Sequence, residues 1–162
     1  MAAGLLIIDV QHGFITAASR AIPARVAALQ DEYDQVFVTR FINPAGSPYR
    51  RFMGWERFAP GSADTGLAFT PRDDAAIIEK PVYSCVTPGF LEILRAAGID
   101  DLHLCGIATD NCVLKCAVDL FEAGLRPVVL ADYCASHGGA EFHAWGLAII
   151  ERLIGAAQVR RG

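Results

Sequence analysis

The sequence predicts a doubly wound α/β domain, in which helices cover both faces of a largely parallel β-sheet. Five short apolar runs are continuous rather than alternating in polarity, which indicates strands that are buried on both faces. Amphipathic helical patterns lie between these runs. Alternation of strands and helices at this spacing favours right-handed βαβ units and one parallel sheet.

Length and composition fit one well-packed domain. The chain has 162 residues and no visible repeat or linker, so we expect residues 1–162 to form a single domain. It is 53% hydrophobic and 20% charged, which is typical of a globular protein. The net charge of −4 argues against nucleic-acid binding, and no apolar stretch reaches the ~18 residues of a membrane span. The N-terminus, MAAGLLIIDVQ, lacks the features of a signal peptide, so we expect a cytoplasmic protein without a membrane partner.

The expected elements alternate along the chain. We expect strands at residues 5–10, 35–41, 75–80, 101–107 and 126–132, and a short edge strand in the tail AAQVRRG. We expect helices at residues 21–33, 87–98, 109–124 and 140–155. Thr87 and Thr109 are the candidate N-caps of the second and third helices, and Gly98 and Gly124 stand where these helices should end.

Residues 43–74 interrupt this alternation. The segment is rich in Gly, Pro and aromatic residues, and loops of this length in compact domains are commonly functional walls or lids. A short helix is expected near Arg50 to Phe58. A surface covering or a subunit contact is an equally good interpretation from the residues alone.

The cysteines favour a reducing compartment. They stand at positions 85, 105, 112, 116 and 134, an odd number that indicates free thiols. Cys112 and Cys116 lie four residues apart, which is poor spacing for a zinc site. We expect most of the five to be small core residues, but Cys112 stands where an apolar strand gives way to a helix.

Three polar residues follow buried strands. Asp9 closes the first strand, Lys80 closes the third, and Cys112 follows the fourth. Ligands of open parallel sheets bind beyond the carboxyl ends of the strands, so we expect these three residues to converge. A carboxylate can take a thiol proton, an ammonium favours the thiolate, and N–H groups in the first turn of a helix can hold an oxyanion. Each residue alone also has a plain structural explanation, as a turn cap, a surface lysine or a core thiol, and only their combination favours catalysis.

Four segments together resemble the isochorismatase-like cysteine hydrolase superfamily, which includes nicotinamidases and N-carbamoylsarcosine amidases. They are LLIIDVQHGF (5–14), IIEKPVYSCV (77–86), LCGIATDNCVLKCAVDL (104–120) and the weaker LADYCAS (130–136). The stretch GIATDNCV is specific, and the order of the segments covers nearly the whole chain.

The resemblance implies both a fold and a mechanism. It implies a Rossmann-like three-layer α/β/α fold with a six-stranded, mostly parallel sheet, and a catalytic triad of Asp9, Lys80 and Cys112. It implies a cis peptide bond between Ile107 and Ala108, and an oxyanion hole formed by the backbone N–H groups of Ala108 and Cys112. Cys112 would attack the carbonyl of a small-molecule substrate to give an acyl-thioester, which water activated by Asp9 would then release as an acid. Neighbouring subunits often complete the pocket in this superfamily, so we expect a homodimer or homotetramer, with residues 43–74 and the last helix as candidate contacts.

The chain departs from the nicotinamidase pattern after the second strand. Nicotinamidases carry an Asp-x-His metal motif there, whereas this chain reads TRFINPAG without any of its four histidines. We therefore expect no zinc and no other cofactor, which argues against nicotinamide as the substrate. Isochorismate-cleaving members generally lack the nucleophilic cysteine, so Cys112 favours cleavage of an amide or a related C–N bond.

Further pocket residues are candidates only. Gln11 is a candidate for orienting a polar group near Asp9, and Phe14, Trp55 and Tyr83 are candidate pocket walls, although aromatic residues are at least as common in cores. Arg50 or Arg51 could bind a substrate carboxylate, but a solvated loop is the simpler interpretation.

Two functions without hydrolysis compete with this hypothesis. A ligand-binding module for nucleotides is disfavoured because DVQHGF, after the first strand, has one glycine instead of a glycine-rich turn. A thiol redox sensor would use Cys112 and Cys116, but would have no need of Lys80 and Asp9.

Overall fold

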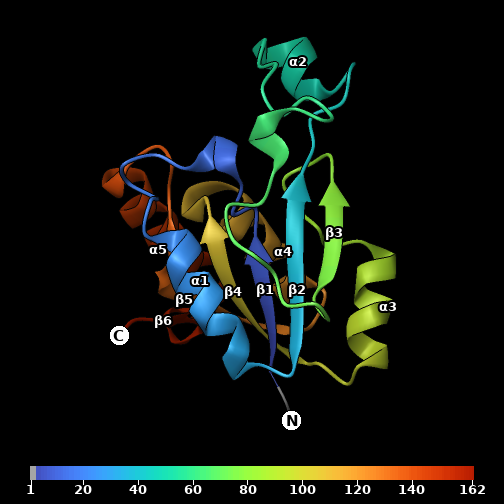
Figure 1. Cartoon of the computed structure of the whole chain (residues 1–162). Helices are drawn as coiled ribbons and strands as arrows, with labels where there is room; N and C mark the ends of the chain where they lie inside the picture. The colour runs from blue at the N-terminus through green and yellow to red at the C-terminus, as the bar shows by residue number, and fades with distance from the viewer. Residues whose placement is uncertain (1–2) are drawn as a thin grey trace.

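The computed structural model describes residues 3–162, and its centre is a six-stranded sheet with helices on both faces (Figure 1). All neighbouring strands pair in parallel, in the order β3-β2-β1-β4-β5-β6. The strands are β1 (Gly4–Ile8), β2 (Gln35–Phe41), β3 (Ala76–Lys80), β4 (Asp101–Ile107), β5 (Arg126–Ala135) and β6 (Val159–Arg160). The predicted three-layer α/β class is thus confirmed, including the short edge strand of the tail.

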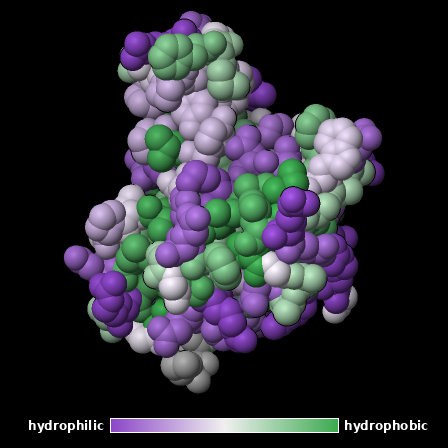
Figure 2. Space-filling view, turned by 180° about the vertical axis from the view of Figure 1, so that it is seen from behind, coloured by the Kyte–Doolittle hydropathy of each residue, from purple (hydrophilic) through white to green (hydrophobic). Residues whose placement is uncertain are grey.

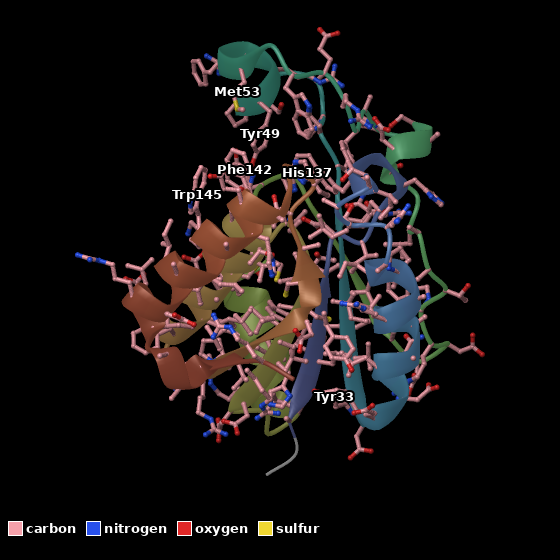
Figure 3. All side chains as sticks on the ribbon, turned by 90° about the vertical axis from the view of Figure 1, so that its left-hand side faces the viewer. Tyr33, Tyr49, Met53, His137, Phe142 and Trp145 are labelled. Carbon is pink, nitrogen blue, oxygen red and sulfur yellow. The ribbon has the colours of Figure 1, made fainter. Side chains whose placement is uncertain are left out.

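The helices divide between the two faces. They are α1 (Ile22–Leu29), α2 (Pro48–Met53), α3 (Pro88–Ala96), α4 (Leu114–Glu122) and α5 (Ala140–Ile154), and a π-type turn at Thr109–Val113 precedes α4. α1 covers one face of the sheet, whereas α4 and α5 lie side by side on the other (Figures 1 and 3). α2 stands beyond the carboxyl ends of the strands (Figure 1). None of the helices in residues 3–162 has the length and apolar character needed to cross a membrane.

The sheet brings two strand ends together at its centre. β1 lies between β2 and β4. After β1 the chain adds β2 and β3 on one side of it, and then crosses back to add β4, β5 and β6 on the other side. The side chains of Leu5, Leu6, Ile7 and Ile8 are fully buried, because helices cover both faces of this strand. The strand order reverses between β1 and β4, which is where open α/β sheets bind their ligands.

Gly106 allows β4 to lie close to β1 at this point. Its φ of 120° is one that side chains rarely adopt, and a Cβ atom there would stand 2.1 Å from the carbonyl oxygen of Ile8. The pairing of β4 with β5 also shifts register between Leu104 and Gly106. The backbone therefore changes course just before it reaches Ala108.

Some predicted boundaries were wrong for local reasons. β5 continues to Ala135, three residues beyond the predicted end. α2 spans Pro48–Met53 instead of the expected region from Arg50 to Phe58, because Ser47 caps its start by accepting a hydrogen bond from the Arg50 N–H and Gly54 ends it with a φ of 64°.

The two expected threonine caps differ in outcome. Thr87 caps α3 as predicted, accepting a 3.2 Å hydrogen bond from the N–H of Phe90. Thr109 does not cap its helix, because it lies inside the π-type turn and its hydroxyl is 2.6 Å from Nδ1 of His143 on α5. The start of this helix is therefore fixed by contact with α5.

Candidate active site

Asp9, Lys80 and Cys112 meet beyond the carboxyl ends of β1, β3 and β4. Nζ of Lys80 lies 2.6 Å from Oδ2 of Asp9 and 3.6 Å from Sγ of Cys112. Asp9 is 0%, Lys80 3% and Cys112 6% exposed. One ammonium group therefore contacts both the carboxylate and the thiol in a site nearly closed to solvent.

Two features hold Asp9 in place. Its backbone adopts a φ of 48°, which turns the chain sharply after β1. Thr39 of β2 donates a 2.6 Å hydrogen bond to Oδ1 and accepts one of 3.1 Å from the backbone N–H of Asp9. Oδ1 is thus bound by a hydroxyl and Oδ2 by Lys80, which fixes the orientation of the carboxylate.

Lys80 reaches the site from the edge strand β3. Its ammonium donates a further hydrogen bond of 3.1 Å to the carbonyl of Val82. Burial alone would lower the pKa of Lys80, but the negative charge of Asp9 and the neighbouring Cys112 thiol outweigh burial and raise that pKa above its ordinary value. Lys80 is therefore a fixed cation at neutral pH.

Cys112 is a protonated thiol at neutral pH. Burial raises its pKa well above the ordinary value, the charge of Asp9 raises it further, and the Lys80 ammonium opposes these effects only in part. Lys80 thus favours the thiolate, as expected, but does not create it in the free protein. Ionisation of this thiol requires a group that accepts its proton, and Asp9 is the carboxylate beside it.

Ala108 and Cys112 lie on one wall of a cavity. The peptide bond between Ile107 and Ala108 is cis. The carbonyl of Ala108 accepts hydrogen bonds of 3.1 Å from the N–H groups of Asn111 and Val113, which closes the π-type turn around Cys112. This turn presents Ala108 and Cys112 to the same space.

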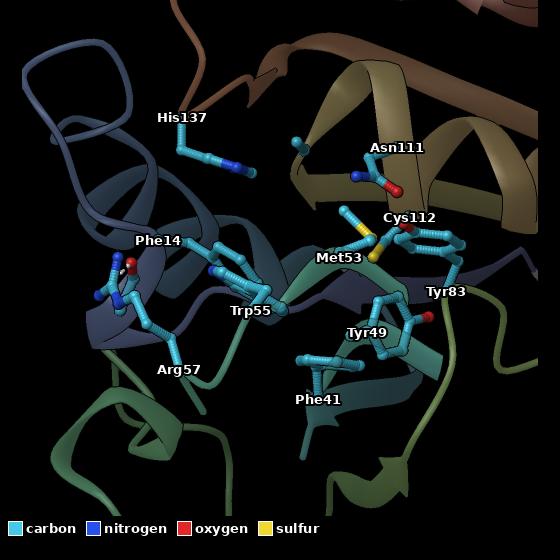
Figure 4. Close-up of a pocket in the computed structure, with 12 residues that line it drawn as sticks. Phe14, Phe41, Tyr49, Met53, Trp55, Arg57, Tyr83, Asn111, Cys112 and His137 are labelled. Carbon is cyan, nitrogen blue, oxygen red and sulfur yellow. Dashed lines mark hydrogen bonds between the residues drawn. The ribbon is translucent and has the colours of Figure 1, made fainter. Parts of the chain in front are cut away.

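That space is a cavity of about 350 Å³ (Figure 4). Five of its twelve lining residues are Phe, Tyr or Trp, and it has room for a small molecule. Its lining residues are Gly13, Phe14, Phe41, Tyr49, Met53, Trp55, Arg57, Tyr83, Ala108, Asn111, Cys112 and His137.

Three of the four candidate pocket residues lie in this lining. Phe14, Trp55 and Tyr83 all line the cavity. They also pack on other rings, since Phe14 stacks on Phe58 with ring centroids 4.1 Å apart. Their position fits both interpretations of the sequence, as pocket wall and as aromatic core.

Gln11 does not reach the cavity, contrary to expectation. Its side chain is fully buried and is bound to backbone groups at the end of β2 and in the turn at Ala63–Thr65. Its amide nitrogen donates to the carbonyls of Phe41 and Thr65 at 2.9 and 3.0 Å, and its oxygen accepts from the N–H of Phe41 at 2.8 Å. Gln11 therefore joins the end of β2 to the turn at Ala63–Thr65 and does not line the cavity.

The segment 43–74 forms one wall of the cavity. It supplies Tyr49, Met53, Trp55 and Arg57 to the lining. Arg50 and Arg51 are absent from the lining, and an Nη atom of Arg50 instead donates to the carbonyl of Asn43 at 3.1 Å. The simpler interpretation of these two arginines, as loop residues, fits their positions.

The other cysteines lie in the core. All five are free and buried. The redox-sensor hypothesis assumed that Cys112 is the partner of Cys116. Sγ of Cys116 instead lies 3.8 Å from Sγ of Cys85.

Sequence reasoning missed six lining side chains: Phe41, Tyr49, Met53, Arg57, Asn111 and His137. His137 follows β5, so the strand-end rule that selected Asp9 and Lys80 would have found it, whereas Phe41 closes β2 but is apolar and falls outside that rule. Asn111 precedes Cys112 directly. The four lining residues of segment 43–74 do not directly follow a predicted strand, so the strand-end rule does not mark them.

Comparison with known proteins now identifies the family. The family model of the isochorismatase domain matches residues 3–159. The chain belongs to the isochorismatase family. A curated relative, the nicotinamidase/pyrazinamidase of Mycobacterium tuberculosis, is 30% identical in an alignment of 160 residues. The match covers 81% of this chain and 85% of the relative. The resemblance seen in the sequence is thus confirmed.

Other relatives of this isochorismatase-family chain match over less of their length or share the fold alone. An isochorismatase family protein of Bacillus subtilis is 44% identical over 80 residues, and the chain spans only 43% of that relative. The structure of pyrazinamidase from Pyrococcus horikoshii in complex with zinc has a TM-score of 0.82 at 19% identity and covers 100% of this chain and 99% of that one. N-carbamoylsarcosine amidase from Thermoplasma acidophilum has a TM-score of 0.80 at 24% identity, with 99% and 96% covered.

The residues of this family member do not fit a zinc ion. Within residues 3–162, no group of three or more His, Cys, Asp and Glu side chains is arranged to hold a metal. After β2, where nicotinamidases carry their metal motif, the side-chain nitrogen of Asn43 donates 2.9 Å hydrogen bonds to the carbonyls of Trp55 and Arg57, and its oxygen accepts one from Ser47. Asn43 therefore organises the loop, and metal-independent activity stays a prediction.

Proposed function

We propose that this chain is a cysteine hydrolase that cleaves a small amide or a related C–N bond through an acyl-thioester on Cys112. The observation that carries the proposal is the position of the Lys80 ammonium, 2.6 Å from Asp9 and 3.6 Å from Cys112, beside a cavity of about 350 Å³. Membership of the isochorismatase family and the similarity to a nicotinamidase/pyrazinamidase support amide chemistry.

In the first half of the reaction, Asp9 takes the thiol proton as the sulfur of Cys112 attacks the carbonyl carbon. The backbone N–H groups of Ala108 and Cys112 hold the oxyanion of the tetrahedral intermediate. The C–N bond then breaks, and the leaving nitrogen takes the proton from Asp9. Lys80 stays charged throughout and stabilises both the thiolate and the carboxylate.

In the second half, Asp9 takes a proton from a water molecule, whose oxygen attacks the thioester. The C–S bond breaks, the thiolate recovers its proton, and an acid is released. The raised pKa of Cys112 fits this order of steps, because the thiol then forms a thiolate only when Asp9 accepts its proton. Zinc has no part in these steps.

The experiment is a hydrolysis assay with a panel of small amides, together with intact-protein mass spectrometry to detect an acyl group on Cys112. Cys112→Ser should remain folded and lose turnover, whereas Cys116→Ser, one helical turn away, should retain it. If Cys112→Ser kept full turnover of a cleaved amide, the mechanism would be wrong. If the wild-type protein hydrolysed no amide while binding a ligand or forming a reversible disulfide, the chain would instead be a ligand-binding or redox-sensing module.

We also propose that the protein forms a homodimer or homotetramer through α5. One side of this helix is apolar and exposed at Phe142 (45%), Trp145 (50%), Ile149 (45%) and Leu153 (49%). Apolar residues gather on the face seen from behind the sheet, which α4 and α5 cover (Figure 2). Sedimentation equilibrium should give a mass above 17.4 kDa, and Trp145→Glu should shift it toward that monomer mass. A wild-type protein that sediments as a monomer would exclude the proposal.

A further inference from the structure

The charges around the cavity are already neutralised by protein groups. Lys80 pairs with Asp9. Arg57 donates hydrogen bonds of 3.1 and 2.8 Å to the carboxylate of Asp64, and another of 3.1 Å to the carbonyl of Gly13. Its guanidinium lies at the edge of the cavity (Figure 4). Arg57 in the lining and the neighbouring Lys80 are thus each already paired with a carboxylate of the protein.

Two other polar side chains face the cavity. Asn111 precedes Cys112 in the π-type turn, and His137 follows the end of β5. Figure 4 shows both side chains extending into the opening, with no hydrogen bond to another of the residues drawn. The ring of His137 is supported by Phe14, with ring centroids 5.0 Å apart. Their donors and acceptors therefore face the cavity.

His137 is uncharged at neutral pH. Partial burial lowers its pKa, Asp110 opposes this effect, and Arg57 adds to it. A neutral imidazole and a carboxamide each offer a donor and an acceptor. The two side chains can therefore recognise a hydroxyl, an amide or a ring nitrogen, but they do not compensate a negative charge.

We infer that Asn111 and His137 form a neutral hydrogen-bonding subsite, which selects uncharged substrates that carry a polar group remote from the scissile carbonyl. The inference rests on the proposed function, because Cys112 defines where that carbonyl lies. The aromatic walls formed by Phe14, Trp55 and Tyr49 take the apolar body of the substrate. An apolar substituent leaves the subsite unpaired, and a carboxylate loses hydration without gaining a cation that offsets its charge.

The test measures equilibrium binding, so that it does not depend on turnover. Cys112→Ala, which removes the nucleophile, is titrated calorimetrically with the meta and para isomers of hydroxybenzamide, methylbenzamide and carboxybenzamide. The best hydroxyl isomer should bind about fivefold or more tighter than its methyl and carboxylate counterparts, as one neutral hydrogen bond allows. In the Cys112→Ala background, adding His137→Leu or Asn111→Leu should remove this preference, whereas His137→Gln should retain part of it. The control is His12→Leu, which changes an exposed histidine outside the lining and should leave the preference unchanged.

The outcomes separate the subsite from the chemistry. Four results would each overturn the inference. They are equal binding of the three substituents, tighter binding of the carboxylates, a preference that survives both leucine variants, and no binding at millimolar concentration. In an otherwise wild-type enzyme that cleaves these amides, His137→Leu should raise KM for the hydroxyl substrate and leave kcat nearly unchanged. Loss of turnover in Cys112→Ser tests the proposed function separately, and either result can fail without the other.

Discussion

Lys80 and Asp9 form an ion pair of 2.6 Å that is almost completely withdrawn from solvent. Removing two charges from water costs several kcal/mol per ion, and their attraction offsets this only when further hydrogen bonds complete the geometry. Thr39 provides one such bond to Asp9, and the carbonyl of Val82 provides one to Lys80. Replacing a buried ion pair by an apolar pair is often neutral or stabilising, so stability alone does not account for these charges, whereas the proposed function of Cys112 does.

Removing Lys80 alone should destabilise the protein, whereas removing both charges should restore much of the loss. Lys80→Met leaves the Asp9 carboxylate buried without a cation, and we expect the free energy of unfolding to fall by roughly 3–5 kcal/mol. In the double variant Asp9→Asn, Lys80→Met no charge is stranded, so most of that stability should return while hydrolysis remains lost. Urea denaturation of the wild type and of both variants measures this. A double variant no more stable than Lys80→Met would contradict the interpretation.

Asp9→Asn should have opposite effects on hydrolysis and on alkylation of Cys112. The charge of Asp9 raises the pKa of the thiol, so its removal, with Lys80 retained, should lower that pKa. The pH profile of iodoacetamide alkylation at Cys112, mapped by peptide mass spectrometry, should move to lower pH. Turnover should fall by about 10²–10⁴-fold, because the base is gone. The control is Asp64→Asn, which removes a carboxylate bound to Arg57 and should leave the alkylation profile unchanged. If the profile did not move in Asp9→Asn, the charge of Asp9 would not be a cause of the raised pKa of Cys112.

The core thiols should make the protein less stable in alkali. Burial raises the pKa of Cys105 well above its ordinary value and that of Cys134 to about 12. The unfolded thiol ionises near about pH 8.5, so each stabilising contribution is complete below that pH and is lost as pH rises toward the folded pKa. Each thiol should lower the free energy of unfolding by about 1.4 kcal/mol per pH unit in this range. Denaturation from about pH 8 to pH 11 should show the decline, and Cys134→Ala should flatten it; an unchanged slope in that variant would refute the assignment.

The residues of the candidate triad could be predicted because each stands at the end of a recognisable strand. Asp9, Lys80 and Cys112 interrupt apolar runs, and the geometry of a parallel sheet brings such positions to one edge. Gln11 obeys the same rule and yet serves the scaffold, because proximity to a strand end does not show which way a side chain points. Thr39 escaped notice for the opposite reason, since a threonine inside a strand is typical of β-structure and its bond to Asp9 joins residues thirty positions apart.

The cavity and the protonation of Cys112 lie beyond what the sequence could give. Tyr49, Met53, Trp55 and Arg57 come from a segment whose path depends on hydrogen bonds such as those of Asn43, and no periodic pattern records them. The sequence predicted that Lys80 would favour a thiolate. It did not reveal that burial and Asp9 act more strongly in the other direction, because that balance depends on the distances among the groups.

Gly146→Ala should damage the site from the opposite side of the turn that carries Cys112. Gly146 lies in α5, and a Cβ atom there would stand 2.7 Å from both Cα and N of Asp110, so the helix or the turn must move. An alanine inside a helix is otherwise favourable, but this overpacking should lower the free energy of unfolding by about 1–3 kcal/mol and reduce turnover. Gly89→Ala in α3 is the matched control, since the nearest atom to its added Cβ is the Thr87 hydroxyl at 4.0 Å, and it should be neutral or slightly stabilising. Chemical denaturation and the amide assay measure both effects, and a fully active, fully stable Gly146→Ala would show that α5 does not fix the turn.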